Sequence, residues 1–232
     1  MNERFTGFVL SISDYRENDI LMQVLSKEYG LLSLIGKGSR KVAGKNRFLP
    51  CCIYEFIFDY RPGKTIFTVH GSKLAHNYFE DKDIELMTLK NILCELALKN
   101  REIDSYDQLC FVFEHFEKEQ AYLLSCMYLA YLTRKFGITP VVDGCVLCGS
   151  KKVVALSNRH GGFLCIDHLG SEQTVKVELL KKFRLVIKGD FVNYDVMKDF
   201  VYTAQDFKML MGFYLENSDI RLKSYDFYLQ VV

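Results

Sequence analysis

The sequence predicts an α+β protein of several domains: an N-terminal five-stranded β-barrel of the OB type over residues 1–79, a helical domain over 80–140 and 170–232, and a zinc-ribbon-like insertion over 141–169. Three observations predict this organisation. Short runs rich in Val, Ile, Leu and Phe, separated by turn residues, fill the chain to about residue 78. Apolar residues then recur at spacings of three and four, as in amphipathic helices. A segment that matches neither period holds two close pairs of metal-ligand residues.

The composition is that of a folded protein. Of 232 residues, 49% are hydrophobic and 14% aromatic, which excludes extended disorder and collagen-like repeats. The formal net charge is only +1, but residues 1–80 hold 11 basic and 8 acidic side chains, whereas residues 81–140 hold 7 and 10. Net charge therefore does not by itself indicate nucleic-acid binding, and such binding would need a local patch.

The N-terminal residues lack the basic segment and apolar stretch of a secretory signal. The most apolar stretch, residues 121–132, is shorter than the roughly 20 residues that span a bilayer. We therefore expect a cytoplasmic protein without a membrane partner. Because disulfides are rare in that compartment, the eight cysteines are expected to be free thiols or metal ligands.

Five strands are expected in the first domain, over residues 4–15, 20–27, 31–35, 54–60 and 65–70. Pro62 and Gly63 favour a tight turn between the last two, because proline presets φ and glycine accepts a positive φ. Closing so small a sheet into a barrel removes its exposed edges. We therefore predict a five-stranded barrel with Greek-key connections.

Helices are expected after residue 80. Two amphipathic helices cover about 84–97 and 106–116, and an almost wholly apolar helix over 120–136 ends before Gly137. Two more follow the insertion, one over about 174–188 and one that begins at Thr203, whose spacing to Asp206 is that of a capping box. The apolar helix is predicted to be the centre of a bundle.

The strongest motif is Cys145-x-x-Cys148 followed by Cys165-x-x-His168, with sixteen residues between Cys148 and Cys165. Zinc takes four nitrogen or sulfur ligands in tetrahedral geometry, and a two-residue spacer lets both ligands of a turn face one ion. A catalytic zinc keeps one position open, whereas four candidates fill the shell here. The motif therefore predicts one structural zinc ion per chain.

Two alternatives stay open at this site. His160 can replace His168 as the fourth ligand if His168 points away, and the cysteines can be ordinary buried thiols or a disulfide pair, which a cytoplasmic chain disfavours. The other cysteines stand among apolar neighbours, which predicts that they are buried as small hydrophobic side chains. They are Cys51, Cys52, Cys94, Cys110 and Cys126.

Residues 36–47 form a glycine-rich basic loop between the third and fourth expected strands. Its five cations, with no anion among them, are Lys37, Arg40, Lys41, Lys45 and Arg47. Glycine lets the backbone approach phosphates closely, and Lys and Arg add charge-assisted contacts. Small barrels often bind single strands with such a surface and with stacking aromatics, for which Tyr60, Phe67 and Phe48 are candidates. The alternative is a solvated loop without a ligand. The loop does not match a P-loop.

The chain resembles the bacterial recombination mediator family RecO. The resemblance rests on GFVLSISDYRENDILMQVLSKEYGLLSLIGKGSR over residues 7–40, on Pro140-x-x-Asp143-x-Cys145-x-x-Cys148-Gly149 with Gly161-Gly162-x-x-Cys165, and on Leu222-Lys223-Ser224. It extends over essentially the whole chain. One position departs from the pattern, because His168 stands where zinc-bearing members usually have a fourth cysteine.

This resemblance implies a non-enzymatic DNA-binding protein, nucleoid-associated in the cytoplasm. Such proteins bind single- and double-stranded DNA, anneal complementary strands, contact single-strand-binding protein and, with RecR, help to load RecA during repair. It further implies that Lys37, Arg40, Lys41, Lys45 and Arg47 lie along the DNA path, and that the zinc segment braces the helical domain.

The alternative from another class is a barrel-plus-ribbon protein that binds RNA or acts as an adaptor without nucleic-acid contact. Competition between single-stranded DNA and RNA distinguishes these. A metallohydrolase is a more distant alternative, disfavoured by the filled zinc shell.

Overall fold

The computed structural model describes residues 2–40, 47–61, 63–79, 83–102 and 104–232. The chain forms two compact units, Met1–Glu114 with Leu222–Val232, and His115–Arg221. The domain boundaries expected from the sequence stay a prediction. Among the described residues, no helix is long and apolar enough to cross a membrane.

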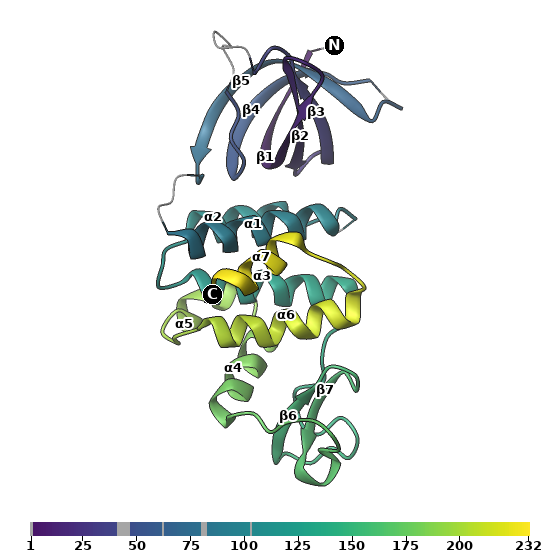
Figure 1. Cartoon of the computed structure of the whole chain (residues 1–232), viewed down its shortest axis with the longest axis vertical. Helices are drawn as coiled ribbons and strands as arrows, with labels where there is room; N and C mark the ends of the chain where they lie inside the picture. Colours follow the sequence, from purple (N-terminus) through teal and green to yellow (C-terminus); the bar gives the residue numbers. More distant parts are fainter. Residues whose placement is uncertain (1, 41–46, 62, 80–82, 103) are drawn as a thin grey trace. The chain divides into compact units, whose positions relative to one another are not determined.

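The first unit contains the predicted closed barrel (Figure 1). Its strands are β1 (Asn2–Tyr15), β2 (Asp19–Ser26), β3 (Gly30–Gly36), β4 (Cys52–Asp59) and β5 (Ile66–Asn77). They pair in the order β1-β2-β3-β5-β4, and β4 closes the sheet on β1. All pairs are antiparallel except β3 with β5. The expected turn before β5 is present, with Gly63 at φ 83° and the Lys64 N–H donating to the Arg61 carbonyl.

Aromatic and aliphatic side chains from the strands fill the barrel. Phe56 is fully buried and its ring lies 5.4 Å from that of Phe5 and 6.0 Å from that of Phe48. Phe48 and Phe67 are only 8% and 5% exposed. The expectation that these two rings stack on bases is therefore wrong, because both belong to the core. Tyr60 is half-buried against Phe67.

Helices α1 (Ile84–Lys99), α2 (Tyr106–Glu114) and α7 (Lys223–Val231) complete the first unit. Helix α7 packs on α1 and was not expected from the sequence. Its first turn is held by Glu95 of α1, whose carboxylate accepts hydrogen bonds from the N–H groups of Lys223 and Ser224 and from the Ser224 hydroxyl. A carboxylate at a helix N-terminus satisfies N–H groups that lack intrahelical partners. The Lys223-Ser224 pair thus has a structural role.

Replacing Glu95 by Ala is expected to destabilise α7 by about 1–2 kcal/mol, because three donors lose a charged acceptor. Amide hydrogen exchange over residues 222–231 measures the effect. Glu102→Ala is the matched control, since the side chain of Glu102 is 92% exposed. Equal exchange in the two variants would contradict the role of Glu95.

The second unit contains α3 (Ala121–Phe136), α4 (Val177–Lys188), α5 (Tyr194–Met197) and α6 (Ala204–Ser218), with short 3₁₀ turns at Ile166–His168 and Phe191–Asn193. Helix α3 is buried along most of its length, packs on α6 and ends at Gly137 with φ 79°. The capping box at Thr203 and Asp206 is present as predicted. Strands β6 (Val153–Ser157) and β7 (Gly162–Cys165) form a hairpin in the insertion.

The five cysteines outside the insertion, all of them among the described residues, form no disulfide. Cys51, Cys52, Cys94 and Cys126 are buried as predicted, whereas Cys110 is half-buried. The sulfur atoms of Cys51 and Cys94 lie 3.6 Å apart.

Candidate metal centre and nucleic-acid interface

A tight turn presents the first cysteine pair. The Cys145 N–H donates to the Ser150 carbonyl and the Gly149 N–H to the Cys145 carbonyl, both at 2.8 Å. Gly149 has φ 76°, a conformation in which a side chain is strained. Gly144 also has no room for a side chain, because a Cβ atom there would lie 2.7 Å from the Gly149 carbonyl oxygen. The glycines around the pair therefore allow the turn that points both thiols to one side.

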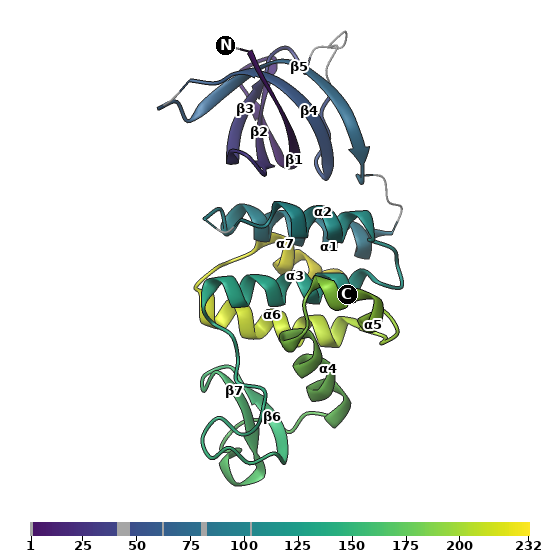
Figure 2. The same ribbon diagram turned by 180° about the vertical axis from the view of Figure 1, so that it is seen from behind.

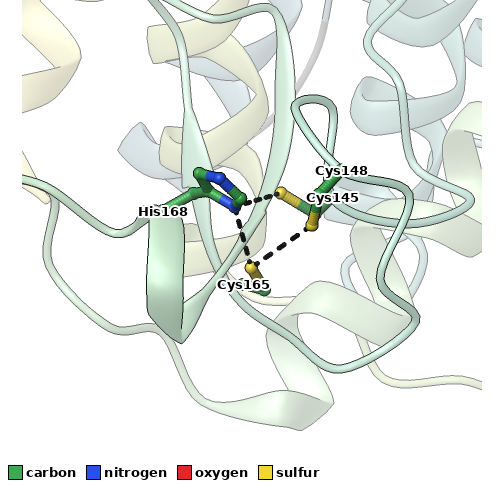
Figure 3. A group of neighbouring side chains, drawn as sticks. All are labelled: Cys145, Cys148, Cys165 and His168. Atoms are coloured by element: carbon green, nitrogen blue, oxygen red, sulfur yellow. Dashed lines mark hydrogen bonds between the residues drawn. The ribbon is translucent and has the colours of Figure 1, made fainter.

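The second pair enters from β7 and the 3₁₀ turn after it, so that four side chains converge (Figure 3). Their four candidate ligand atoms all lie within 4.8 Å of one another. The Cys148 and Cys165 sulfurs are 3.7 Å apart, and His168 Nδ1 lies 3.7 Å from the Cys145 sulfur and 3.3 Å from the Cys165 sulfur. Zinc–sulfur bonds of about 2.3 Å give a tetrahedral edge of about 3.8 Å. Donor type and spacing therefore fit a zinc ion.

The backbone around Cys145 favours its thiolate. Burial alone would raise the pKa of this thiol, but N–H groups of Cys165, Leu147 and Cys148 donate to the sulfur and lower its pKa to about 6. Zinc binds the thiolate form of cysteine. The backbone N–H groups thus favour the form of Cys145 that binds a metal cation.

His160 lies outside the cluster. The Nδ1 atom of His160 is 3.0 Å from the Ser157 hydroxyl, which donates to Glu172 at 2.7 Å. The backbone N–H of His160 donates to the same Ser157 hydroxyl oxygen. Of the two histidines left open by the sequence, the structure brings His168 to the three cysteines.

The described cations of the basic loop are exposed: Lys37 and Arg40 follow β3, and Arg47 precedes β4. Lys41 and Lys45 lie outside the described residues. The start of the loop is fixed to the connection between β1 and β2, because the Gly38 N–H donates to Asp19 and the Arg40 N–H to the Asn18 carbonyl. These hydrogen bonds therefore hold the backbone at the start of the loop, where Lys37 and Arg40 lie.

Arg40 has a partner that the loop sequence did not reveal. Its guanidinium lies 3.1 Å from Asp14 of β1, and the two side chains are 42% and 73% exposed. Such exposed pairs contribute little to stability, so a phosphate can replace the carboxylate. No local pattern could have identified Asp14, since strand pairing brings it to the loop from 26 residues away.

The chain is similar to known proteins over most of its length. Residues 1–78 match the family model described as Recombination protein O N terminal, and residues 81–225 match Recombination protein O C terminal. A protein named DNA repair protein RecO from Exiguobacterium sibiricum is 24% identical over an alignment of 238 positions, gaps included, which covers 97% of this chain and 95% of the relative. Proteins of the same name from Bacillus cytotoxicus and Bacillus mycoides are each 25% identical over 178 residues, which is 72% of this chain and 71% of theirs.

The first family model covers the strands of the barrel. The second covers helices α1 to α6 and the converging Cys and His side chains. Together with a relative that aligns over nearly the full length, they establish that the chain belongs to the RecO family.

Proposed function

We propose that this chain is a DNA-repair recombination mediator without catalytic activity. It binds and anneals single-stranded DNA and, with RecR, helps to load RecA onto strands coated by single-strand-binding protein. Membership of a family whose relatives are named DNA repair proteins supports the repair role. The observation that carries the DNA-binding part is the closed barrel with exposed Lys37, Arg40 and Arg47 at its β3–β4 loop.

The proposed DNA path follows this loop and includes Lys41 and Lys45 by sequence. Cations on a loop contact phosphates and displace counterions without reading bases. Double-stranded DNA is a second ligand of the same kind. Because the rings of Phe48 and Phe67 are buried, we expect contacts to the backbone to dominate over stacking.

Annealing by such a protein needs no catalytic residue. Holding two strands by their phosphates reduces their repulsion and leaves the base edges free for Watson–Crick pairing. In the same proposal one zinc ion, held by Cys145, Cys148, Cys165 and His168, has a structural role, because all four positions around it are filled by protein. We place the protein in the cytoplasm, associated with the nucleoid.

Annealing of complementary oligonucleotides coated with single-strand-binding protein, across a salt series, tests the proposal. We expect faster annealing with the protein than without it, an effect that declines as salt rises. Parallel binding of single-stranded DNA and RNA tests the RNA-binding alternative, and a pull-down with RecR and single-strand-binding protein tests the partners. Preference for RNA, or no effect on annealing, would refute the proposed function.

Replacing Lys37 and Arg40 by Ala is expected to weaken single-stranded DNA binding equally across sequences. Each lost phosphate contact reduces the slope of log K against log salt by about 0.7, so the pair reduces it by about 1.4. Fluorescence anisotropy at several salt concentrations measures the slope. Arg61→Ala with Lys64→Ala is the matched control, because it also removes one arginine paired with an aspartate and one exposed lysine from a loop of the barrel. Equal slopes in the two double variants would remove the β3–β4 loop from the binding surface.

A further inference from the structure

A second basic surface lies in the other unit, where α4 and the β6–β7 hairpin of the insertion are neighbours (Figure 2). A groove of about 530 Å³ runs between them. Its cations come from both sides, Lys151 and Lys152 from the segment before β6 and Lys181 and Arg184 from α4. The one carboxylate that lines it is Asp143. The lining therefore carries a net of three positive charges.

Asp143 holds several of these cations in place, and its single negative charge leaves the lining positive. Arg184 donates to one of its oxygens at 2.8 Å and Lys188, one turn further along α4, to the other at 2.5 Å. Lys151 is held nearby by a hydrogen bond from Nζ to the Asp143 carbonyl oxygen at 2.8 Å. The Asp143 carboxylate thus holds two cations and its backbone carbonyl holds a third, while Lys152 and Lys181 are exposed beside it.

The floor of the groove offers little besides charge. Val142, Phe163 and Leu180 line it but are 4%, 1% and 3% exposed, and the exposed apolar side chain in the lining is Val177 at the start of α4, at 53%. A peptide ligand usually needs an apolar anchor in a pocket, and a base needs the open face of a ring. Neither is provided by these buried side chains. Apart from Val177, the available contacts are charge-assisted hydrogen bonds from the cations on the two sides of the groove, which suit the regularly spaced phosphates of a polynucleotide.

We propose that this groove, defined by Lys151, Lys152, Lys181 and Arg184, binds a second nucleic-acid strand through its phosphates. The inference rests on the proposed function and deepens it, because annealing requires the protein to hold two strands. The barrel loop and the groove belong to different units. Each can therefore hold its own strand, and the zinc-binding insertion contributes one wall of a binding surface in addition to any structural role.

Capture of two strands by the full-length protein tests this. One oligothymidylate is attached to beads and a second, fluorescent one is added; they are not complementary, so only the protein can link them. Lys152→Glu with Lys181→Glu reverses two exposed groove cations. Arg159→Glu with Arg221→Glu is the matched control, since it makes the same change of charge at exposed residues outside the groove lining. Zinc content and thermal unfolding verify that both variants are folded.

We expect the groove variant to bind the first oligonucleotide within about threefold of the control but to capture the second at least tenfold less well. In the native protein, the oligonucleotide should slow amide exchange over residues 142–153 and 177–184. Equal capture of the second strand by both variants overturns the groove proposal alone. Absence of any DNA binding by the native protein overturns the proposed function itself. If a polyglutamate peptide protects the groove and the oligonucleotide does not, the groove is a site for an acidic protein segment and the proposal is wrong.

Discussion

Substituting His168 by Ala is expected to release the zinc ion and to unfold the insertion, whereas His160→Ala leaves both intact. The local core of this segment is very small, formed by Cys145, Ala155, Leu164 and Cys165 with a few half-buried neighbours. Two of those four side chains are themselves candidate ligands. A core of this size does not hold a segment folded, so metal binding supplies the folding free energy, about 10 kcal/mol or more for structural zinc sites.

Metal analysis of the purified proteins and amide exchange over residues 145–165 measure this effect. We expect about one zinc per chain in the native protein and in His160→Ala, and far less in His168→Ala. Chelation of the native protein should give the same loss of protection as His168→Ala. The two histidines stand eight residues apart in one segment, so the pair controls for general damage to it. Full zinc content and protection in His168→Ala would show that the four residues do not form the site.

Replacing Phe56 by Ala is expected to cost about 3–5 kcal/mol of barrel stability. Phe56 has no exposed surface, and its ring contacts those of Phe5, Phe48 and Tyr54 at centroid distances of 5.4 to 6.0 Å. Truncation leaves a cavity that the surrounding strands cannot close, because β4 is paired on both edges, with β1 and β5. That cost is a large part of the roughly 5–15 kcal/mol that typically stabilises a domain.

Amide exchange over β1 to β5 measures barrel stability directly and is suited to this chain, which has no tryptophan to serve as a fluorescent probe. Ile66→Ala on the neighbouring strand β5 is the control, because Ile66 is 41% exposed and its loss should cost less than about 1 kcal/mol. Because the proposed DNA path lies on a loop of the barrel, we also expect Phe56→Ala to weaken DNA binding. Protection of β4 that is unchanged by Phe56→Ala would mean that the ring is not part of a packed core.

Much of the barrel followed from local signals. Short runs rich in Val, Ile, Leu and Phe predicted the strands, and Pro62-Gly63 predicted a turn. The length of β5 did not follow, because its second half, from Gly71 to Asn77, is polar or small apart from the exposed Leu74 and forms a strand by pairing with β4. The burial of Phe48 and Phe67 also could not be predicted, since an aromatic side chain on a strand fits a core or a ligand equally well.

Helix α7 and the groove between α4 and the insertion show a second limit of prediction from local sequence. The first turn of α7 is satisfied by Glu95, more than 120 residues earlier in the chain, so the usual capping residues are absent from its own sequence. In the groove, Lys151-Lys152 and the spacing of Lys181 and Arg184 were visible separately. Only the packing of α4 against the insertion made them face one another.

The sequence by itself determined the fold class, the family resemblance and a metal-ligand set in which one histidine was left open, because periodicity, turn residues and ligand spacing are properties of neighbouring residues. The tertiary structure decided which of two histidines meets the cysteines, which aromatic rings are buried and which acidic group pairs with Arg40. These choices are made among residues that are chemically equivalent. Strand register and helix packing distinguish them, since they bring side chains that are distant in the chain within a few ångströms of each other.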